Sequence, residues 1–431
     1  MPLYLGIDFG TSGCRGCVID AGRHILAESR MPLPPPQRSG AAVEQDPAIW
    51  WTALRAVLAE LGTRVSLTDI RAVCVDGTSS SLLLCDAQGA PLGNALMYND
   101  SRAREAAQQV AAVAPQDCAV HGASASLAKL LWLLQSPAAR DARHALHQAD
   151  WVLGRLRGRY GCSDENNALK LGYDPGARRW PQWLAALAVP ARLLPEVVPA
   201  GTDSGCIDPA MATQFGLAPA TRIISGTTDS TASFIATGAV RGEAVTTLGS
   251  TLVLKVCAEM PVFAPEHGIY SHRLGDDWLA GGASNSGGAV LRQYFTDADI
   301  ARLTQQLQPD RPTGLDYYPL PARGERFPIN DPDLEPLLAP RPQEDARFFQ
   351  GILEGIARIE VQGYRRLAEL GAPWPTRVIS TGGGAANSAW RTIRSQLLGM
   401  PVVAAAHQEA AYGTALLALR GVAAQKAPEE Q

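Results

Sequence analysis

Asp8 is followed by a turn of small residues, a combination that is suited to phosphate chemistry. The acid lies at the end of a short apolar run, and Gly10, Thr11 and Ser12 follow it after Phe9. Backbone N–H groups in such a turn approach phosphate oxygens closely, and a neighbouring carboxylate can hold Mg²⁺ directly or through water. The alternative interpretation is a plain β-hairpin turn, with glycines where a positive φ is needed.

A second acid, Asp229, ends the segment GTTD at residues 226–229, between a predicted strand and a predicted helix. Asp is strongly favoured as the N-cap of a helix, so a purely structural role is one interpretation. The other is a carboxylate that accepts the proton of a substrate hydroxyl, as phosphoryl transfer to an alcohol requires. The residue type and position of Asp229 do not by themselves distinguish these two interpretations.

Two further turns have the composition of nucleotide-binding segments. Three glycines at residues 382–384 precede a predicted helix, in which Asn387 and Trp390 lie one turn apart. Bare backbone at such a turn lets a nucleotide lie against it, although a tight strand–helix turn has the same composition. The other turn contains Gly249, Ser250 and Thr251, and it echoes the Gly-Thr-Ser turn after Asp8, which suggests one phosphate-sized turn in each half of the chain.

Several common enzyme motifs are absent from the sequence. No lysine follows a glycine, so the P-loop motif G-x-x-x-x-G-K-[ST] does not occur. No G-x-G-x-x-G with a downstream acid follows a predicted strand, which argues against a dinucleotide fold. The signatures H-E-x-x-H and G-x-S-x-G are also missing, and their absence removes the common metalloprotease and serine hydrolase classes.

Strand and helix patterns alternate along the chain, and they predict an α/β protein with two lobes. A helix is expected from Pro47 to about Leu61, where the apolar residues follow helical spacing. A second lobe is expected to begin near Thr221, so the predicted division is 1–220 and 221–431. Strands are expected at residues 3–8, 14–20, 70–76, 82–86 and 222–226 and after residue 377, and residues 245–256 are expected to form a strand, a turn and a second strand.

Composition limits the partners and the location that we expect. The 431 residues include 38 Lys+Arg and 42 Asp+Glu, a net charge of −4 that argues against nucleic acid as a partner. Eight cysteines are too few for a disulfide scaffold, and the Cys14–Cys17 pair falls on a predicted strand, which favours a structural role. No apolar stretch reaches the roughly 18 residues of a membrane span, and no signal peptide is recognised. We therefore expect a cytoplasmic enzyme with no membrane partner.

Taken together, these segments resemble the FGGY family of carbohydrate kinases. Five motifs occur in the order typical of that family, and the resemblance covers nearly the whole chain. It implies a two-lobed actin/hexokinase-like fold, each lobe with a ribonuclease-H-like core, that binds ATP and Mg²⁺ in the cleft between the lobes. The motifs are residues 5–12 (LGIDFGTS), 226–229 (GTTD), 248–251 (LGST), 324–331 (GERFPIND) and 380–385 (STGGGA).

The resemblance also implies a role for each candidate residue. Asp229 would be the catalytic base and would contact the substrate, and Asp8 would lie beside the metal and the sugar. Lobe 1–220 would be the sugar side and lobe 221–431 the nucleotide side, and the last helix could pack back on the first lobe. The implied ATP-binding residues are Gly10, Thr11 and Ser12 near the γ-phosphate, Gly249, Ser250 and Thr251 as a second phosphate turn, and Gly383, Asn387 and Trp390 at the adenine side.

The sugar is suggested by the segment GTSSS at residues 77–81. Xylulose kinases of the family usually carry Gly-Gln-Met-His there, whereas this short chain is more similar to the compact D-ribulose kinase branch. Alternation along an extended segment would place Ser79 toward the sugar. We therefore expect an ATP-dependent kinase of the terminal hydroxyl of D-ribulose, as a monomer or a homodimer.

Alternative functions remain open at this point. They are a D-xylulose kinase or another polyol kinase of the family and, in a different class, a non-metabolic actin-like ATPase. A sugar-binding regulator without turnover is disfavoured, because every expected catalytic residue is present.

Overall fold

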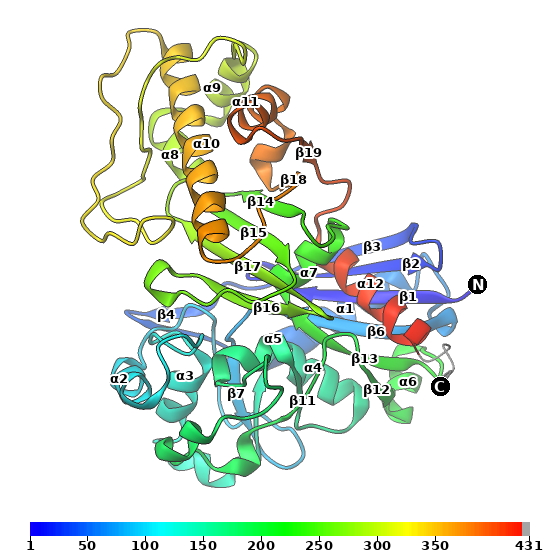
Figure 1. Ribbon diagram of the computed structural model, residues 1–431. Coiled ribbons are helices and arrows are strands. Elements are labelled where there is room, and N and C mark those ends of the chain that lie inside the picture. Colours follow the sequence, from blue (N-terminus) through cyan, green and yellow to red (C-terminus); the bar gives the residue numbers. More distant parts are fainter. Residues whose placement is uncertain (425–431) are drawn as a thin grey trace. The chain divides into compact units, whose positions relative to one another are not determined.

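The computed structural model describes residues 1–424, which form two compact units. The first unit contains residues 1–236 and the C-terminal segment from Glu409, and the second extends from Thr237 to Gln408. Both units combine a mixed β-sheet with helices (Figure 1). No helix among the described residues is both long enough and apolar enough to cross a lipid bilayer.

The main sheet of the first unit has six strands in the order β12-β13-β6-β1-β2-β3. β1 runs parallel to β6, which in turn runs parallel to β13, whereas β2 and β3 form an antiparallel meander at one side. All seven residues of β1 are buried, as is typical of a central strand that is covered on both faces. The strands are β1 (Leu3–Phe9), β2 (Gly13–Asp20), β3 (Ile25–Pro32), β6 (Ile70–Gly77), β12 (Asp203–Cys206) and β13 (Arg222–Thr228).

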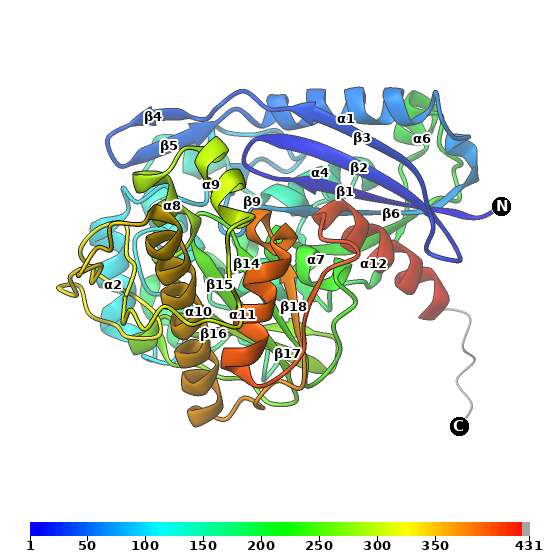
Figure 2. The ribbon, with the colours of Figure 1, turned by 90° about the horizontal axis from the view of Figure 1, so that it is seen from above.

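Helices cover both faces of this sheet. α1 (Pro47–Leu61) packs against β2 and β3, and α12 (Ala410–Ala424) packs against β1, β6 and α7 (Asp229–Ala236). Figure 2 shows α1 and α12 on opposite sides of the sheet. The contact with α12 is very close, because a Cβ at Gly6 would lie 2.1 Å from the carbonyl oxygen of Ala411. Only glycine allows this approach.

A smaller sheet and several short helices complete the first unit. The sheet has the order β4-β5-β8-β7-β9. α4 packs against β6 and β13 of the main sheet, and α3 packs against β7 and α2. The elements are β4 (Gln37–Ser39), β5 (Ala42–Gln45), β7 (Leu82–Cys85), β8 (Ala95–Leu96), β9 (His144–His147), β10 (Cys162–Asp164), β11 (Glu196–Val198), α2 (Arg104–Val113), α3 (Ser126–Leu133), α4 (Gln148–Arg157), α5 (Glu165–Ala168) and α6 (Pro209–Phe215).

The expected boundary between residues 220 and 221 does not coincide with the division of the chain. β13 lies beyond that boundary, yet it pairs with β6 and belongs to the sheet of the first unit. The first unit therefore continues through α7 to Ala236, and it takes up the chain again at Glu409. The observed boundary lies later than expected because the strand at residues 222–228 forms backbone hydrogen bonds with a strand that lies far earlier in the sequence.

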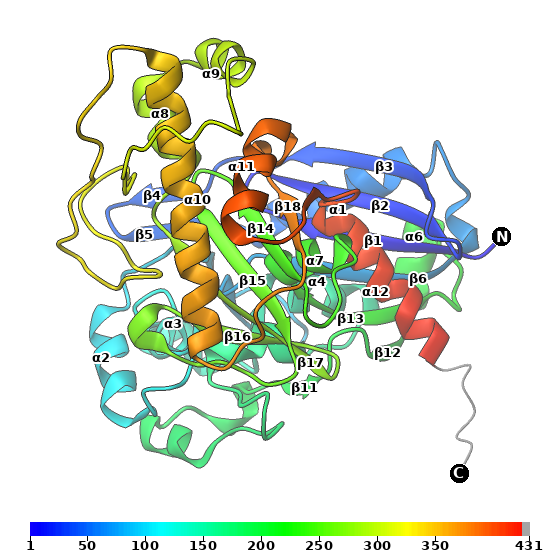
Figure 3. The ribbon, with the colours of Figure 1, turned by 45° about the horizontal axis from the view of Figure 1, so that its top comes forward.

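The second unit has a six-stranded sheet in the order β16-β17-β15-β14-β18-β19. Its long helix α10 and the shorter α11 contact each other, and Figure 3 shows them side by side along the sheet. Apolar residues of α10 and of the strands form the core between these layers. The elements are β14 (Ala244–Leu248), β15 (Leu252–Ala258), β16 (Tyr270–Leu274), β17 (Asp277–Ser284), β18 (Val378–Thr381), β19 (Val402–Ala404), α8 (Gly288–Tyr294), α9 (Asp297–Thr304), α10 (Asp345–Glu369) and α11 (Ser388–Leu398).

Candidate active site

Three carboxyl groups lie at the carboxyl ends of neighbouring parallel strands in the first unit. Asp8 is near the end of β1, Asp76 is near the end of β6, and Asp229 directly follows β13. The strand register places Asp8 beside Asp76 and Asp76 beside Thr227. Open α/β sheets bind their ligands at this edge, so the arrangement is that of a candidate active site.

Asp8 is held by an ion pair with Arg15 on the adjacent strand. Arg15 Nη1 donates a hydrogen bond of 2.7 Å to Asp8 Oδ2, and the Asp8 side chain is almost completely buried. Arg15 Nε also lies 3.7 Å from a carboxylate oxygen of Glu409, which precedes α12. One arginine therefore balances part of the negative charge at this end of the sheet and fixes the orientation of Asp8.

Asp229 is the first residue of α7 and is partly exposed. Its Oδ1 accepts a hydrogen bond of 2.6 Å from the backbone N–H of Ser230. This contact satisfies one of the N–H groups at the start of the helix that have no partner within the helix itself. Because the carboxyl group also remains partly accessible beside Asp8 and Asp76, the position is compatible with a base that meets a substrate hydroxyl.

Asp76 was not predicted from the sequence, although the structure places it between the two predicted acids. It is fully buried, and burial together with the charges of Asp8 and Asp229 raises its pKa well above the ordinary value. Thr414 on α12 donates a hydrogen bond to its Oδ2, an interaction that opposes the rise in pKa. Its Oδ1 has no hydrogen-bond partner within residues 1–424.

This cluster fits a divalent cation bound through Asp8. Several carboxyl groups share one strand edge, and the unpartnered buried oxygen of Asp76 indicates a deficit of positive charge there. No group of three or more His, Cys, Asp or Glu side chains in the described part of the chain is arranged to hold a metal ion by itself. Mg²⁺ commonly takes only one or two carboxylates and completes its shell with water and substrate phosphates.

The turn between β1 and β2 presents polar groups next to Asp8. Gly10 donates its N–H to the carbonyl oxygen of Gly13 over 3.0 Å, which closes the hairpin. Thr11 and Ser12 at its tip are exposed. The segment is a β-hairpin turn, as the structural interpretation expected, and its tip leaves two hydroxyl groups accessible to a ligand.

The segment after β6 is a turn, so the prediction of an extended segment was wrong. Ser81 donates its N–H to the Thr78 carbonyl oxygen over 3.3 Å, and Ser80 has a φ of 68°, in the left-handed region. Alternation along a strand therefore does not explain where Ser79 points. Thr78, Ser80 and Ser81 are buried, whereas Ser79 is partly exposed, so it is the one hydroxyl of the four that the turn presents outward.

Beneath this turn lies a fully buried lysine, Lys129 of α3. Burial lowers its pKa to about 7, and the charge of Asp100 partly opposes the effect while those of Lys170 and Arg102 add to it. An unfolded chain would keep the lysine protonated up to its ordinary pKa of 10.5. Between these two values the unfolded state binds more protons than the folded state, so stability increases with pH in this window.

We expect the free energy of unfolding of the wild-type protein, relative to Lys129→Met, to rise between pH 7 and about pH 10. Each unit of lowered pKa corresponds to about 1.4 kcal/mol, and the difference should level off below pH 7, where both states are protonated. Urea denaturation of both proteins across this range measures the effect. A difference that is independent of pH would show that Lys129 keeps an ordinary pKa in the folded state.

In the second unit, two glycine-containing turns emerge from adjacent strands. β14 and β18 are parallel, and Thr247 Oγ1 lies 2.8 Å from Thr381 Oγ1 across them. The 249–251 turn follows β14, and the 382–384 turn follows β18. A Cβ at Gly382 would lie 2.7 Å from the Leu248 carbonyl oxygen, so the 382–384 turn lies close against the end of β14.

Both turns expose backbone on their outer faces. Ser250 is exposed, and its carbonyl oxygen accepts from Ala289 N–H at the start of α8 over 3.1 Å. Gly383 is exposed, and a Cβ there would meet nothing within 4 Å. The outer faces of both turns are thus open backbone surfaces at one strand edge, as a nucleotide phosphate or sugar requires.

Trp390 does not fit the expected contact with adenosine. Its side chain is 4% exposed, lies in the core of the second unit and donates its indole N–H to the Leu353 carbonyl oxygen over 3.0 Å. A Cβ at Gly384 would come within 2.6 Å of its ring. Trp390 therefore supports the glycine turn from beneath. Asn387 is the N-cap of α11, since its side chain accepts from the Trp390 N–H.

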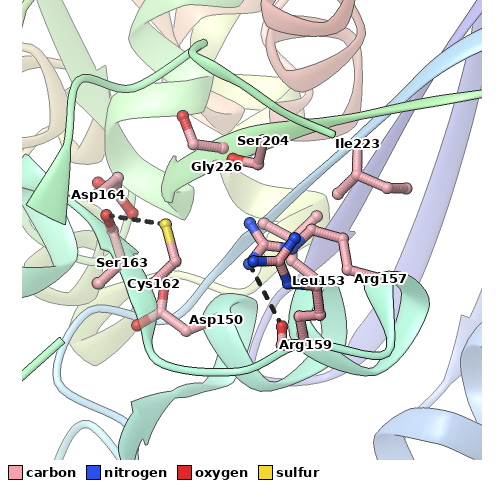
Figure 4. Close-up of a pocket in the computed structure, with 12 residues that line it drawn as sticks. Asp150, Leu153, Arg157, Arg159, Cys162, Ser163, Asp164, Ser204, Ile223 and Gly226 are labelled. Carbon is pink, nitrogen blue, oxygen red and sulfur yellow. Dashed lines mark hydrogen bonds between the residues drawn. The ribbon is translucent and has the colours of Figure 1, made fainter. Parts of the chain in front are cut away.

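A small cavity lies beside β13, at Gly226 (Figure 4). Its volume is about 20 Å³, which is room for one water molecule and not for a sugar or a nucleotide. Two lining atoms, Arg157 Nε and Ser163 Oγ, have no hydrogen-bond partner among the described residues. A buried water here would satisfy them, and the cavity is separate from the carboxyl cluster that we describe as the candidate site.

Comparison with known proteins identifies the family of both halves of the chain. Residues 3–236 match the N-terminal domain, and residues 244–422 match the C-terminal domain, of the FGGY family of carbohydrate kinases. The chain is 25% identical to a xylulose kinase from Escherichia coli over 92% of this chain and 85% of the relative. It is 27% identical to a xylulose kinase from Streptomyces coelicolor over 93% of this chain and 84% of the relative.

A solved structure shares the fold across nearly the whole chain. The crystal structure of a protein described as a xyloylose kinase from Brucella ovis has a TM-score of 0.87 and 24% identity, and the match covers 98% of this chain and 91% of that one. The predicted two-lobed α/β fold of the actin/hexokinase type is confirmed, as is the predicted enzyme class. With both family domains present in order, the chain belongs to the FGGY family of carbohydrate kinases and is an ATP-dependent sugar phosphotransferase.

Proposed function

We propose that this enzyme transfers the γ-phosphoryl group of ATP to the terminal hydroxyl of a ketopentose, D-ribulose, and forms D-ribulose 5-phosphate. The observation that carries the proposal is the partly exposed carboxyl group of Asp229, which follows β13 at the strand edge shared with Asp8 and Asp76. Such a group is placed to meet the one substrate atom that must lose a proton during the reaction.

In this mechanism Asp229 accepts the proton of the terminal hydroxyl, and the oxygen attacks the γ-phosphorus in line with the departing ADP. The hydrogen bond from the Ser230 N–H keeps the carboxylate in one orientation. The hydrogen bond from Arg15 likewise keeps the carboxylate of Asp8 in one orientation. Mg²⁺ held through Asp8 would neutralise charge on the phosphoryl group that is transferred.

We assign the nucleotide to the open turns. Thr11 and Ser12 offer exposed hydroxyl groups next to Asp8 for the γ-phosphate. Gly10 has no side chain, so the phosphate can approach the backbone of that turn closely. The turn formed by Gly249, Ser250 and Thr251 would bind phosphate, and the exposed backbone at Gly383 would lie against adenosine. Asn387 shapes this site as the cap of α11.

D-xylulose is the second candidate substrate, because the relatives that match most of the chain are named xylulose kinases. D-ribulose and D-xylulose differ in the orientation of one hydroxyl group. We favour D-ribulose because the turn after β6 presents a short hydroxyl at Ser79, held out from a buried turn of fixed shape. A buried polar group left unpaired by the wrong epimer costs about 1–3 kcal/mol.

We expect the wild-type enzyme to prefer D-ribulose over D-xylulose at least tenfold in kcat/KM, a difference of about 1.4 kcal/mol at the transition state. Ser79→Ala should reduce that preference while leaving the KM for ATP close to the wild-type value. A coupled ADP-release assay across pentuloses, pentitols, glycerol and hexuloses measures both. Equal or faster turnover of D-xylulose by the wild-type enzyme would contradict the D-ribulose assignment and leave the broader kinase function standing.

A further inference from the structure

The buried Lys129 connects two loops by hydrogen bonds to their backbones. Its Nζ donates to the carbonyl oxygens of Ser80 over 2.8 Å, Met97 over 2.7 Å and Tyr98 over 3.3 Å. The first belongs to the 78–81 turn after β6, and the other two belong to the segment that follows β8. One side chain therefore fixes the distance between two segments that are far apart in the sequence.

The same two segments are joined once more, and each presents a side chain outward. Tyr98 donates its N–H to Ser81 Oγ over 3.1 Å. Ser79 is partly exposed, and Tyr98 is 39% exposed. The turn is also held at Thr78, whose N–H and hydroxyl donate to Gln148 Oε1 over 3.0 and 2.9 Å. The backbone is thus anchored from inside while Ser79 and Tyr98 face outward.

A lysine at this depth carries a cost in stability. Removing an ammonium group from water is costly, and its neighbours on α3 (Leu127, Leu130 and Leu131) are buried apolar residues. A methionine has a similar length and would fill the same space without the cost of burying an ammonium group, but the three carbonyl oxygens would lose the donor that Lys129 provides. Only a donor at Nζ, however, can hold three carbonyl oxygens from two loops in one arrangement. What the lysine adds is the fixed relative position of these loops.

We propose that Lys129 is a positioning residue for the acceptor sugar. It clamps the 78–81 turn to the 97–98 segment and thereby sets where Ser79 and Tyr98 stand at the sugar site. An ammonium offers one donor for each of the three carbonyl oxygens, whereas a neutral amine offers donors for only two of them. The inference rests on the proposed ketopentose kinase function.

The test compares Lys129→Met with Ser126→Ala. Ser126 lies in the same helix, is equally buried and has a hydrogen bond of 2.9 Å with His147 Nε2, so its loss removes a buried contact that involves neither loop. For Lys129→Met we expect the KM for the ketopentose to rise at least tenfold (about 1.4 kcal/mol), the KM for ATP to stay within about twofold, and the epimer preference to fall. Ser126→Ala should lower stability and leave both KM values near those of the wild type.

A second measurement needs no substrate. Amide hydrogen exchange in the 79–81 and 97–99 segments should become faster in both segments together in Lys129→Met, and should be unchanged there in Ser126→Ala. An unchanged ketopentose KM in an active Lys129→Met enzyme would overturn the inference, as would unchanged exchange in both segments. Absence of ketopentose turnover in the wild-type enzyme would instead overturn the proposed function.

If Lys129→Met does not fold, Lys129→Gln takes its place, because it keeps a donor of shorter reach. We expect it to raise the ketopentose KM without changing the KM for ATP. A ketopentose KM equal to that of the wild type would overturn the proposed role of Lys129.

Discussion

The Asp229→Asn variant should lose at least about 10²-fold in turnover, because general acid–base groups contribute about 10²–10⁴-fold to rates of this kind. Asparagine has nearly the same shape and still accepts the hydrogen bond from the Ser230 N–H at the start of α7. It cannot take a proton from the sugar hydroxyl. ATP affinity should stay within about twofold of the wild type, because the base acts on the acceptor. Steady-state ADP release and ATP binding by calorimetry measure the two quantities.

A control tests whether a substitution beside Asp229 lowers turnover when the carboxyl group is kept. Ser230→Ala changes the exposed neighbour of Asp229 but leaves the carboxyl group and the backbone N–H in place. We expect its turnover to be close to that of the wild type. If Asp229→Asn retained near-normal turnover, Asp229 would be only a helix cap, and another group would have to be the base.

The strands that carry these acids could be predicted because each shows a local signal. Residues 3–8 and 70–76 are short apolar runs that end in an acid, and the structure confirms them as β1 and β6. The helix expected from Pro47 to about Leu61 is also confirmed as α1, with Asp46 as its cap. A buried central strand leaves a continuous apolar run in the sequence, and this signal needs no knowledge of its partners.

Asp76 was missed although a signal was present. The sequence DGTS at residues 76–79 resembles the segment DFGTS at residues 8–12 that drew attention to Asp8, and it differs by the absence of a residue between the acid and the glycine. The structure shows that the two acids are register partners on parallel strands. That pairing joins residues 68 positions apart (76 − 8), so local patterns could suggest each acid separately but not their contact.

The expectations that failed depend on geometry that alternation and periodicity do not encode. The alternation argument for Ser79 failed because Ser80 takes a left-handed conformation and turns the chain. Trp390 lies in the first turn of a helix that follows the glycine turn, as expected, but helical spacing alone did not show that its ring lies in the core beneath Gly384. The boundary at residue 220 failed because β13 is held by long-range pairing with β6.

The second large effect is expected at the glycine turn of the second unit. In Gly383→Val the KM for ATP should rise at least tenfold, equal to about 1.4 kcal/mol, because the new side chain would occupy the surface that we assign to adenosine. The site is suited to this test, since a Cβ at Gly383 meets no atom within 4 Å and no left-handed φ is required there. Sugar affinity measured without nucleotide should be nearly unchanged.

The neighbouring glycines show why this position is informative. Gly382 has a φ of 79° and lies against the Leu248 backbone, and Gly384 lies against the Trp390 ring, so side chains at either position would disturb the fold. Gly93 in the first unit is a matched control, because it is exposed, has no left-handed φ and also has open space around its Cβ position. Gly93→Val should leave the KM for ATP near the wild-type value. An unchanged KM for ATP in a folded Gly383→Val enzyme would show that this turn is not part of the nucleotide site. A valine side chain at a position that contacts ATP would hinder binding of the nucleotide.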